Sequence, residues 1–227
     1  MKNDPTGSFP FPQEAVQTFI QRVYQWMAAG LALTGFVAAW AATQPGVLRA
    51  LVGGGFLLLM LVELGLVIWL SASITKISPA AATTGFLVYS ALNGLTLSFI
   101  FVVYTGASIA STFFITAGTF AGVSIFGWVT KSDLSSLGGY LMMGLIGVIL
   151  ASVVNFFFHS PVLYWILTYA GLAVFIGLTA YDTQRLKEIH QTGAGATDQI
   201  AILGALRLYL DFINMFLLLL RLFGRKR

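Results

Sequence analysis

Long apolar stretches dominate the sequence and are separated only by short polar connections. A helix that crosses the hydrocarbon core of a bilayer needs roughly 20 apolar residues. Windows of that length predict seven membrane spans, at residues 21–43, 50–73, 80–104, 107–129, 137–158, 161–183 and 200–223. Charged residues make up 9% of the chain, whereas soluble domains carry about a quarter. Because lipid cannot satisfy the open edges of a sheet, we expect an all-α integral membrane protein in a lipid bilayer.

A polar tail, residues 1–20, precedes the first span, and its prolines disfavour a helix there. A helix is expected to open near Gln13. The apolar core of a cleaved signal peptide would lie much earlier in the chain, so no such peptide is predicted. The connections between the spans are too short for a second domain, and residues 21–227 are predicted to form one seven-span membrane domain.

The basic residues of short loops indicate the orientation, since they favour the cytoplasmic side of a membrane. If all seven segments cross, the basic residues on the side of the N-terminus are Lys2, Arg22, Lys76, Lys131, Arg185 and Lys187. The internal loops on the other side carry only Arg49, which predicts a cytoplasmic N-terminus. Arg225, Lys226 and Arg227 oppose this orientation, because seven crossings place them outside. The alternative is a last segment that enters the membrane and returns without crossing.

Composition excludes several classes of function. The chain has no cysteine, which removes disulfides and thiolate metal sites, and its two histidines, His159 and His190, do not form a ligand pattern. The formal net charge is +4, but the basic residues lie mainly at the ends of spans, so no face suits a nucleic acid. Nucleotide-binding loops and nucleophile–base pairs are not found in the sequence. We therefore expect neither nucleic-acid binding nor enzymatic activity.

Two aspartates near the end of the chain are the main candidate site. Asp211 lies in the middle of the last span, where an acid is costly unless it is neutral, paired or hydrated. Asp182 lies at the end of the sixth span, and its alternative role is that of an interfacial acid whose charge stays in water. If the chain reverses across the polar loop between them, the two carboxylates approach from neighbouring helices. This requires the sixth helix to continue to about Ile189, or the last helix to start deeper.

Such a pair of carboxylates would bind protons as a unit, because both cannot ionise cheaply at low dielectric. Its oxygens could also bind Ca²⁺, which takes about 6–8 oxygen ligands, with Asn214, carbonyls or water completing the set. Spacing alone does not select Ca²⁺ over protons or Na⁺. Arg207 offers a simpler alternative, since it lies four residues before Asp211 on the same helical face and could neutralise it within the helix.

Glu63 is a third acid at membrane depth, in the second span. In one interpretation its carboxyl group is neutral and hydrogen-bonded to a neighbouring helix. In the other it belongs to an ion or proton path. Tyr209 and Asn214 add hydrogen-bonding capacity to the last span, and both would be ordinary packing residues if the aspartates do not meet.

Two motifs, GLTAYDTQRLK and LYLDFINMFLLLLRLFG, together resemble the C-terminal signature of the transmembrane Bax inhibitor motif (Bax inhibitor-1) family, in its bacterial branch. VELGLVIWLS in the second span resembles that family as well. The resemblance implies a seven-helix bundle in which six helices wrap a central last helix in two layers. It also implies a pH-sensitive calcium leak in the bacterial inner membrane, with Asp182 and Asp211 as the sensor and Glu63 beside the pore.

One position departs from the family pattern. The resemblance implies a basic residue at the end of the second helix that latches one sensor aspartate in the closed state. The corresponding position here is Ile74, so the latch is Lys76, Arg207 or missing. The resemblance implies an alternative function too, because some bacterial relatives bind a membrane protease or another membrane partner through the cytoplasmic tail.

Overall fold

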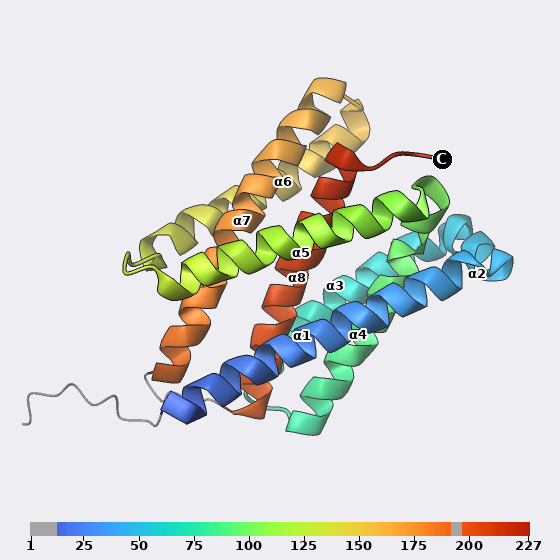
Figure 1. The fold of residues 1–227 in the computed structure, drawn as a ribbon. Coiled ribbons are helices and arrows are strands. Elements are labelled where there is room, and N and C mark those ends of the chain that lie inside the picture. Colours follow the sequence, from blue (N-terminus) through green and yellow to red (C-terminus); the bar gives the residue numbers. More distant parts are fainter. Residues whose placement is uncertain (1–12, 192–196) are drawn as a thin grey trace, which may run out of the picture.

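The computed structural model describes residues 13–191 and 197–227 (Figure 1). In chain order its elements are α1 (Gln13–Ala42), α2 (Pro45–Ala50), the π-helical turn η1 (Leu51–Gly55), α3 (Phe56–Ser73), α4 (Pro79–Val103), α5 (Gly106–Val129), α6 (Ser135–Phe158), α7 (Pro161–Gln191) and α8 (Asp198–Phe223). With α2, η1 and α3 taken as one unit, seven helical segments are long and apolar enough to cross a membrane. The predicted all-α membrane architecture with seven spans is confirmed.

Helices α4 and α5 begin at polar N-cap residues that lie in the short connections before them. The hydroxyl of Ser78 accepts from the backbone N–H of Ala81 at 3.2 Å, and that of Thr105 accepts from Ser108 at 3.3 Å. These side chains satisfy N–H groups that a helix start leaves without partners. Consecutive helices therefore reverse direction within a few residues.

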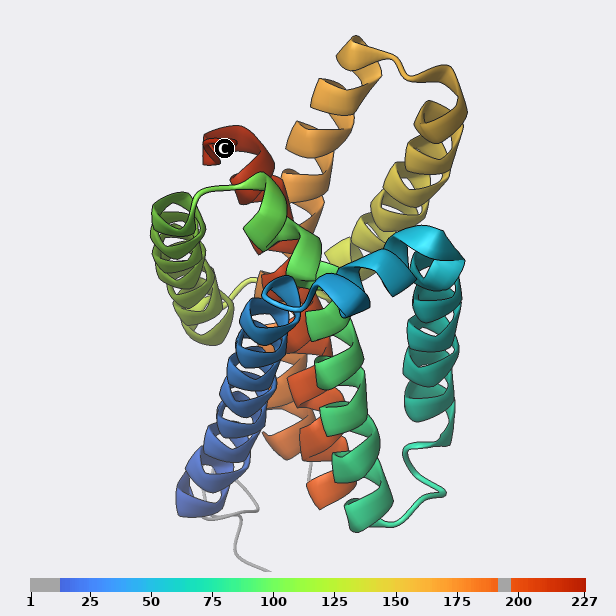
Figure 2. The ribbon, with the colours of Figure 1, turned by 90° about the vertical axis from the view of Figure 1, so that its right-hand side faces the viewer.

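Helix α8 lies in the centre of the bundle (Figures 1 and 2). In its apolar stretch 72% of the residues are buried inside the protein, against 0–33% in the other six spans. Helices α1, α4, α5 and α7 pack directly on α8, whereas α3 packs on α4 and α6 packs on α7. The prediction of a central last helix wrapped by the others is confirmed.

The second span is bent near its start. Gly54 has a φ of +104°, and Gly53 is also non-helical, so α2 and α3 do not share an axis. A left-handed φ is unstrained only for glycine. Figure 2 shows α2 and η1 running crosswise between the end of α1 and the start of α3. The span predicted at 50–73 is present, and the glycines of LVGGG bend it near its start, which apolar length alone does not indicate.

The last helix runs unbroken from one end of the bundle to the other. Beyond Gly224 the chain lies beside the connection of α4 and α5, where Thr105 N–H donates to the Arg225 carbonyl at 3.1 Å and Arg227 N–H donates to the Val103 carbonyl at 2.9 Å. That connection lies at the end opposite the start of α8. The alternative of a last segment that enters and returns is therefore wrong.

Helix α1 begins at Gln13, as expected, so residues 13–20 belong to a helix although they were grouped with the polar tail. An ion pair of 2.5 Å between Arg22 and Asp198 joins α1 to the start of α8. Residues 1–12, which the alternative function assigns to partner binding, lie outside the described residues.

Candidate functional site

The structure brings the two predicted aspartates and Arg207 together between α7 and α8. Helix α7 continues to Gln191, past Ile189, so Asp182 lies well inside it and faces the central helix. The side chain of Asp182 is 13% exposed, and Asp211 is 5% exposed. Asp211 interacts electrostatically with both Asp182 and Arg207. We call these three residues, Asp182, Arg207 and Asp211, the aspartate cluster.

Arg207 pairs across the helix interface and not along its own helix. Its Nη1 lies 4.0 Å from Oδ1 of Asp182. Within the described residues no ion pair joins Arg207 to Asp211, although the Arg207 charge acts on the Asp211 carboxyl group. Asp211 keeps one buried oxygen, Oδ2, without any hydrogen-bond partner there. A buried acceptor without a donor is destabilising, and a bound proton or cation would relieve it.

The residues after Asp182 fix the rotation of α7. Gln184 accepts from the N–H of Leu134 at 2.8 Å and donates to the carbonyl of Ser132 at 2.9 Å. Lys187 donates to the carbonyl of Trp128 at 2.7 Å, and its charge lies over the indole ring. These contacts hold the connection of α5 and α6 against α7. None of these contacts was predicted, although a glutamine two residues after the motif aspartate was an available signal.

Glu63 lies in a second polar group, on the other side of α8. Its carboxylate is 8% exposed and accepts from Asn93 Nδ2 at 3.3 Å and from the Thr96 hydroxyl. The Tyr209 hydroxyl donates to Asn93 Oδ1 at 3.1 Å and lies 2.6 Å from the Thr34 hydroxyl. This Glu63 network, formed by Thr34, Glu63, Asn93, Thr96 and Tyr209, therefore connects α3, α4, α8 and α1.

Tyr209 holds its place in the network by packing as well as by hydrogen bonds. Its ring is fully buried and makes edge contacts with Phe86 and Tyr89, with centroids 5.7 and 5.9 Å away. The hydroxyl of Thr34 also lies 2.8 Å from the carbonyl of Ser90, so its one hydrogen serves either Ser90 or Tyr209. The contacts of Tyr209 with Asn93 and Thr34 were not predicted, because these partners lie 116 and 175 positions away along the chain.

Comparison with known proteins gives the family. The family described as "Inhibitor of apoptosis-promoting Bax1" matches residues 16–227. The chain is 52% identical to "Inner membrane protein YbhL" of Escherichia coli over 95% of both chains. It is 43% identical to an uncharacterized protein of Borreliella burgdorferi over 92% of both chains. The chain belongs to the Bax inhibitor-1 family. The resemblance stated from its C-terminal motifs is thereby confirmed.

The remaining candidate residues of this Bax inhibitor-1 family protein lie apart from both polar groups. Asn214 donates to the carbonyl of Leu210 in its own helix at 2.8 Å. Ile74 is buried, and Lys76 is exposed, with no ion pair or side-chain hydrogen bond to any described residue. Of the residues considered for the latch, Arg207 is the one that pairs with one of the two aspartates here, Asp182.

The aspartate cluster does not fit a resident Ca²⁺ ion. Ca²⁺ takes about 6–8 oxygen ligands, and the cluster offers two carboxylates with a guanidinium beside them. Nowhere in the described parts of the chain do three His, Cys, Asp or Glu side chains gather in a way that could hold a metal ion. In this member of the Bax inhibitor-1 family the cluster is better suited to a proton than to a bound metal.

Proposed function

We propose that this protein is a pH-sensitive leak channel for cations, with Ca²⁺ as the expected cation, in the inner membrane of a bacterium. The carrying observation is Asp211, which is buried in the central helix beside Asp182 and Arg207 with one oxygen unpaired. The printed name of the Escherichia coli relative supports the location. A cytoplasmic N-terminus, expected from the loop charges, belongs to the same proposal.

The proton-sensitive step is assigned to the aspartate cluster. Carboxylates close together at low dielectric bind protons as a unit. Asp182 and Arg207 form an ion pair between α7 and α8. A proton on Asp182 neutralises its carboxylate and removes this attraction. A fall in pH therefore loosens α8 from α7.

Tyr209 transmits this change to Glu63. Residues two positions apart on a helix point about 200° apart, so Tyr209 and Asp211 lie on opposite sides of α8. A displacement of α8 at Asp211 moves the Tyr209 hydroxyl away from Asn93, which is one of the two donors to Glu63. Without the Tyr209 hydroxyl to hold its Oδ1, the Asn93 amide is free to turn its Nδ2 away from Glu63. That turn leaves a Glu63 oxygen free for a passing cation, and carboxylate oxygens suit Ca²⁺. The proposed role is conduction, without an enzymatic step.

Ca²⁺ flux in proteoliposomes, measured over a range of pH, tests the sensor. Flux through the unmodified protein is expected to rise as pH falls. Asp182→Asn and Asp211→Asn are expected to flatten this dependence, because neither amide takes up a proton. Asp133→Asn is the matched control, since Asp133 is an exposed acid that accepts from the N–H of Ser135 at 2.8 Å. Asparagine caps a helix as well as aspartate does, so this variant should follow the unmodified curve.

Two results would contradict the sensor: an unchanged pH curve in both aspartate variants, or an equal change in the control. Glu63→Gln separates the path from the sensor. It is expected to lower flux at every pH while leaving the shape of the pH curve intact. A changed shape with unchanged maximal flux would place Glu63 in the sensor and not in the path.

A further inference from the structure

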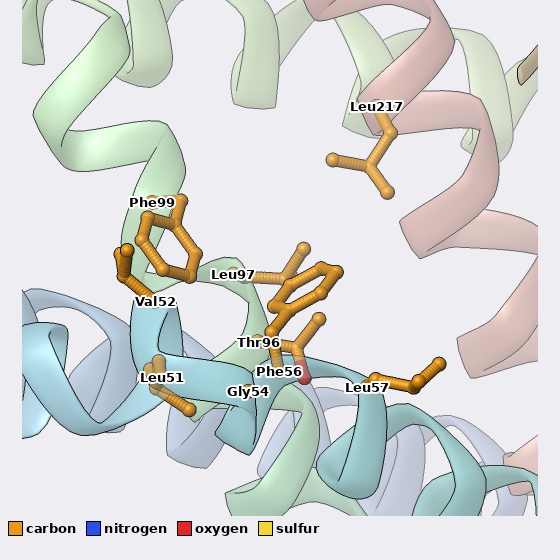
Figure 3. Close-up of a pocket in the computed structure, with 9 residues that line it drawn as sticks. All are labelled: Leu51, Val52, Gly54, Phe56, Leu57, Thr96, Leu97, Phe99 and Leu217. Carbon is orange, nitrogen blue, oxygen red and sulfur yellow. The ribbon is translucent and has the colours of Figure 1, made fainter.

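An apolar cavity of about 630 Å³ lies beside the bend of the second span. Its walls come from η1 and the start of α3, from α4 and from α8, and include Val52, Phe56, Thr96, Phe99 and Leu217 (Figure 3). Thr96 contributes the one polar side chain among the lining residues. Figure 3 shows Leu217 approaching from α8 across the space from the residues of α3 and α4. A cavity of roughly 300–1,000 Å³ is large enough for a drug-sized ligand.

The bend at the glycines keeps this cavity open to the membrane. Gly54, with its φ of +104°, turns α2 and η1 away from the axis of α3. Helix α3 packs on α4 but is largely exposed to the surroundings of the bundle. The aromatic rings of Phe56 and Phe99 meet edge to face, with centroids 5.6 Å apart, and form one firm side of the recess. The acyl chain of a lipid is the apolar group that a bilayer supplies to such a cavity.

Arg49 supplies a positive charge close to the cavity along the chain. It lies on α2, in the turn before the lining residues Leu51 and Val52, and is exposed. No ion pair or side-chain hydrogen bond joins it to any residue that the structure describes. A basic side chain next to a recess between transmembrane helices is suited to the phosphate of a lipid headgroup.

The charge at this end of the bundle also favours an anion. The end at which α1, α4 and α8 finish carries the basic residues Arg49, Arg221, Arg225, Lys226 and Arg227. The acidic residues of the described ranges lie at the other end or inside the bundle: Glu14, Glu63, Asp133, Asp182, Glu188, Asp198 and Asp211. An anion near Arg49 therefore meets attraction without repulsion from a neighbouring carboxylate side chain.

We propose that this cavity and Arg49 form a binding site for an anionic phospholipid. One acyl chain occupies the cavity, and the headgroup phosphate contacts the Arg49 guanidinium. The acyl chain lies against Thr96, whose hydroxyl donates to Glu63, so the lipid borders the Glu63 network. The inference depends on the cavity and the charges alone and does not require the proposed conduction.

Photo-cross-linking tests the site. The protein is reconstituted in nanodiscs with phosphatidylglycerol that carries a diazirine in its acyl chain, and adducts are mapped by mass spectrometry. Adducts are expected to concentrate on residues 51–57 and 96–99 relative to the exposed face of α6, for example Phe156, which reports general lipid contact. Equal labelling of the cavity and of α6 would overturn the site.

Three variants locate the headgroup and the chain. Arg49→Gln is expected to lower cavity labelling about fivefold, the loss expected for one basic residue near anionic lipid, and Arg49→Lys should retain most of it. Val52→Trp changes an exposed lining residue and should reduce labelling by filling the recess. Lys131→Gln, an exposed residue between α5 and α6 at the other end of the bundle, is the control and should label as the unmodified protein does.

Labelling of α6 distinguishes a lost lipid site from a misfolded variant. Labelling of α6 is measured in the same digest and must stay constant in every variant. Unchanged cavity labelling in both Arg49→Gln and Val52→Trp would overturn the proposal. A matched phosphatidylcholine probe is expected to label the cavity less, because its choline cation lies near Arg49. Equal labelling by the two probes would overturn the anionic specificity.

Discussion

The two sides of α8 differ in how well their polar groups are satisfied. On one side Tyr209, Asn93, Thr96 and Thr34 form a hydrogen-bonded chain of uncharged side chains that ends at Glu63. On the other side the aspartate cluster contains an ion pair of 4.0 Å and a buried carboxylate oxygen without a partner. A satisfied buried network rigidifies its surroundings, whereas a partly satisfied one is unstable to a change in charge.

This contrast assigns different tasks to the two sides. The Tyr209 side holds α8 against α1 and α4, and it changes only when the helix moves. In the proposed function the aspartate side changes by gaining a proton, without any movement beforehand, and the central helix converts proton binding into displacement. The following predictions are designed to test that contrast.

The largest effect is expected from Tyr209→Ala. Removing a fully buried aromatic side chain leaves a cavity and should lower the free energy of unfolding by about 4 kcal/mol. Tyr209→Phe keeps the ring and loses only the hydroxyl, so about 1 kcal/mol is expected. Thermal unfolding in detergent micelles measures both. Tyr169→Ala, a change at a ring that is 61% exposed, serves as the control and should be nearly neutral. Equal losses for Tyr209→Ala and Tyr169→Ala would show that the Tyr209 side does not hold the helix.

Arg207→Gln should have the next largest effect, because it removes the cation that acts on both aspartates and leaves only Arg185 near Asp182. We expect a loss of about 2 kcal/mol, less than for a fully buried pair, since Arg207 is 38% exposed. Asp182→Asn in the same chain should restore part of the loss, with a coupling of about 1 kcal/mol in a double-mutant cycle. If the two stability losses are strictly additive, the Arg207–Asp182 ion pair of 4.0 Å does not stabilise the packing of α7 on α8.

The smallest effect, and one of opposite sign, is expected from Asp211→Asn. The amide has no charge to bury, so the midpoint of thermal unfolding should stay unchanged or rise by an amount equivalent to about 1 kcal/mol or less. Asn93→Leu is the comparison on the other side of α8. It removes a donor to Glu63 and an acceptor for Tyr209, and it should lower the midpoint. A clear loss of stability in Asp211→Asn would show that the aspartate side is as well satisfied as the Tyr209 side.

The sequence was informative where a rule depends on local composition. Apolar length predicted all seven spans, and the acids at membrane depth marked both polar groups before any contact was known. Two features were not determined by local signals. Apolar length did not indicate the bend at the glycines of LVGGG, and helical spacing offered Asp211 as one alternative partner for Arg207. Asp182 on the neighbouring helix competes for the same guanidinium, and spacing within one helix cannot reveal it.

What the sequence by itself determined is that this chain forms an all-helical membrane protein of the Bax inhibitor-1 family, with carboxylates inside it. Composition alone did not place α8 at the centre and the still more apolar α6 outside; the family resemblance implied a central last helix, and the tertiary structure shows it. Lipid chains are as apolar as leucine, so an apolar surface does not reveal whether protein or lipid covers it. The same structure joined Tyr209 to Asn93 and Arg207 to Asp182, because partners on different helices are chosen by packing and not by spacing along the chain.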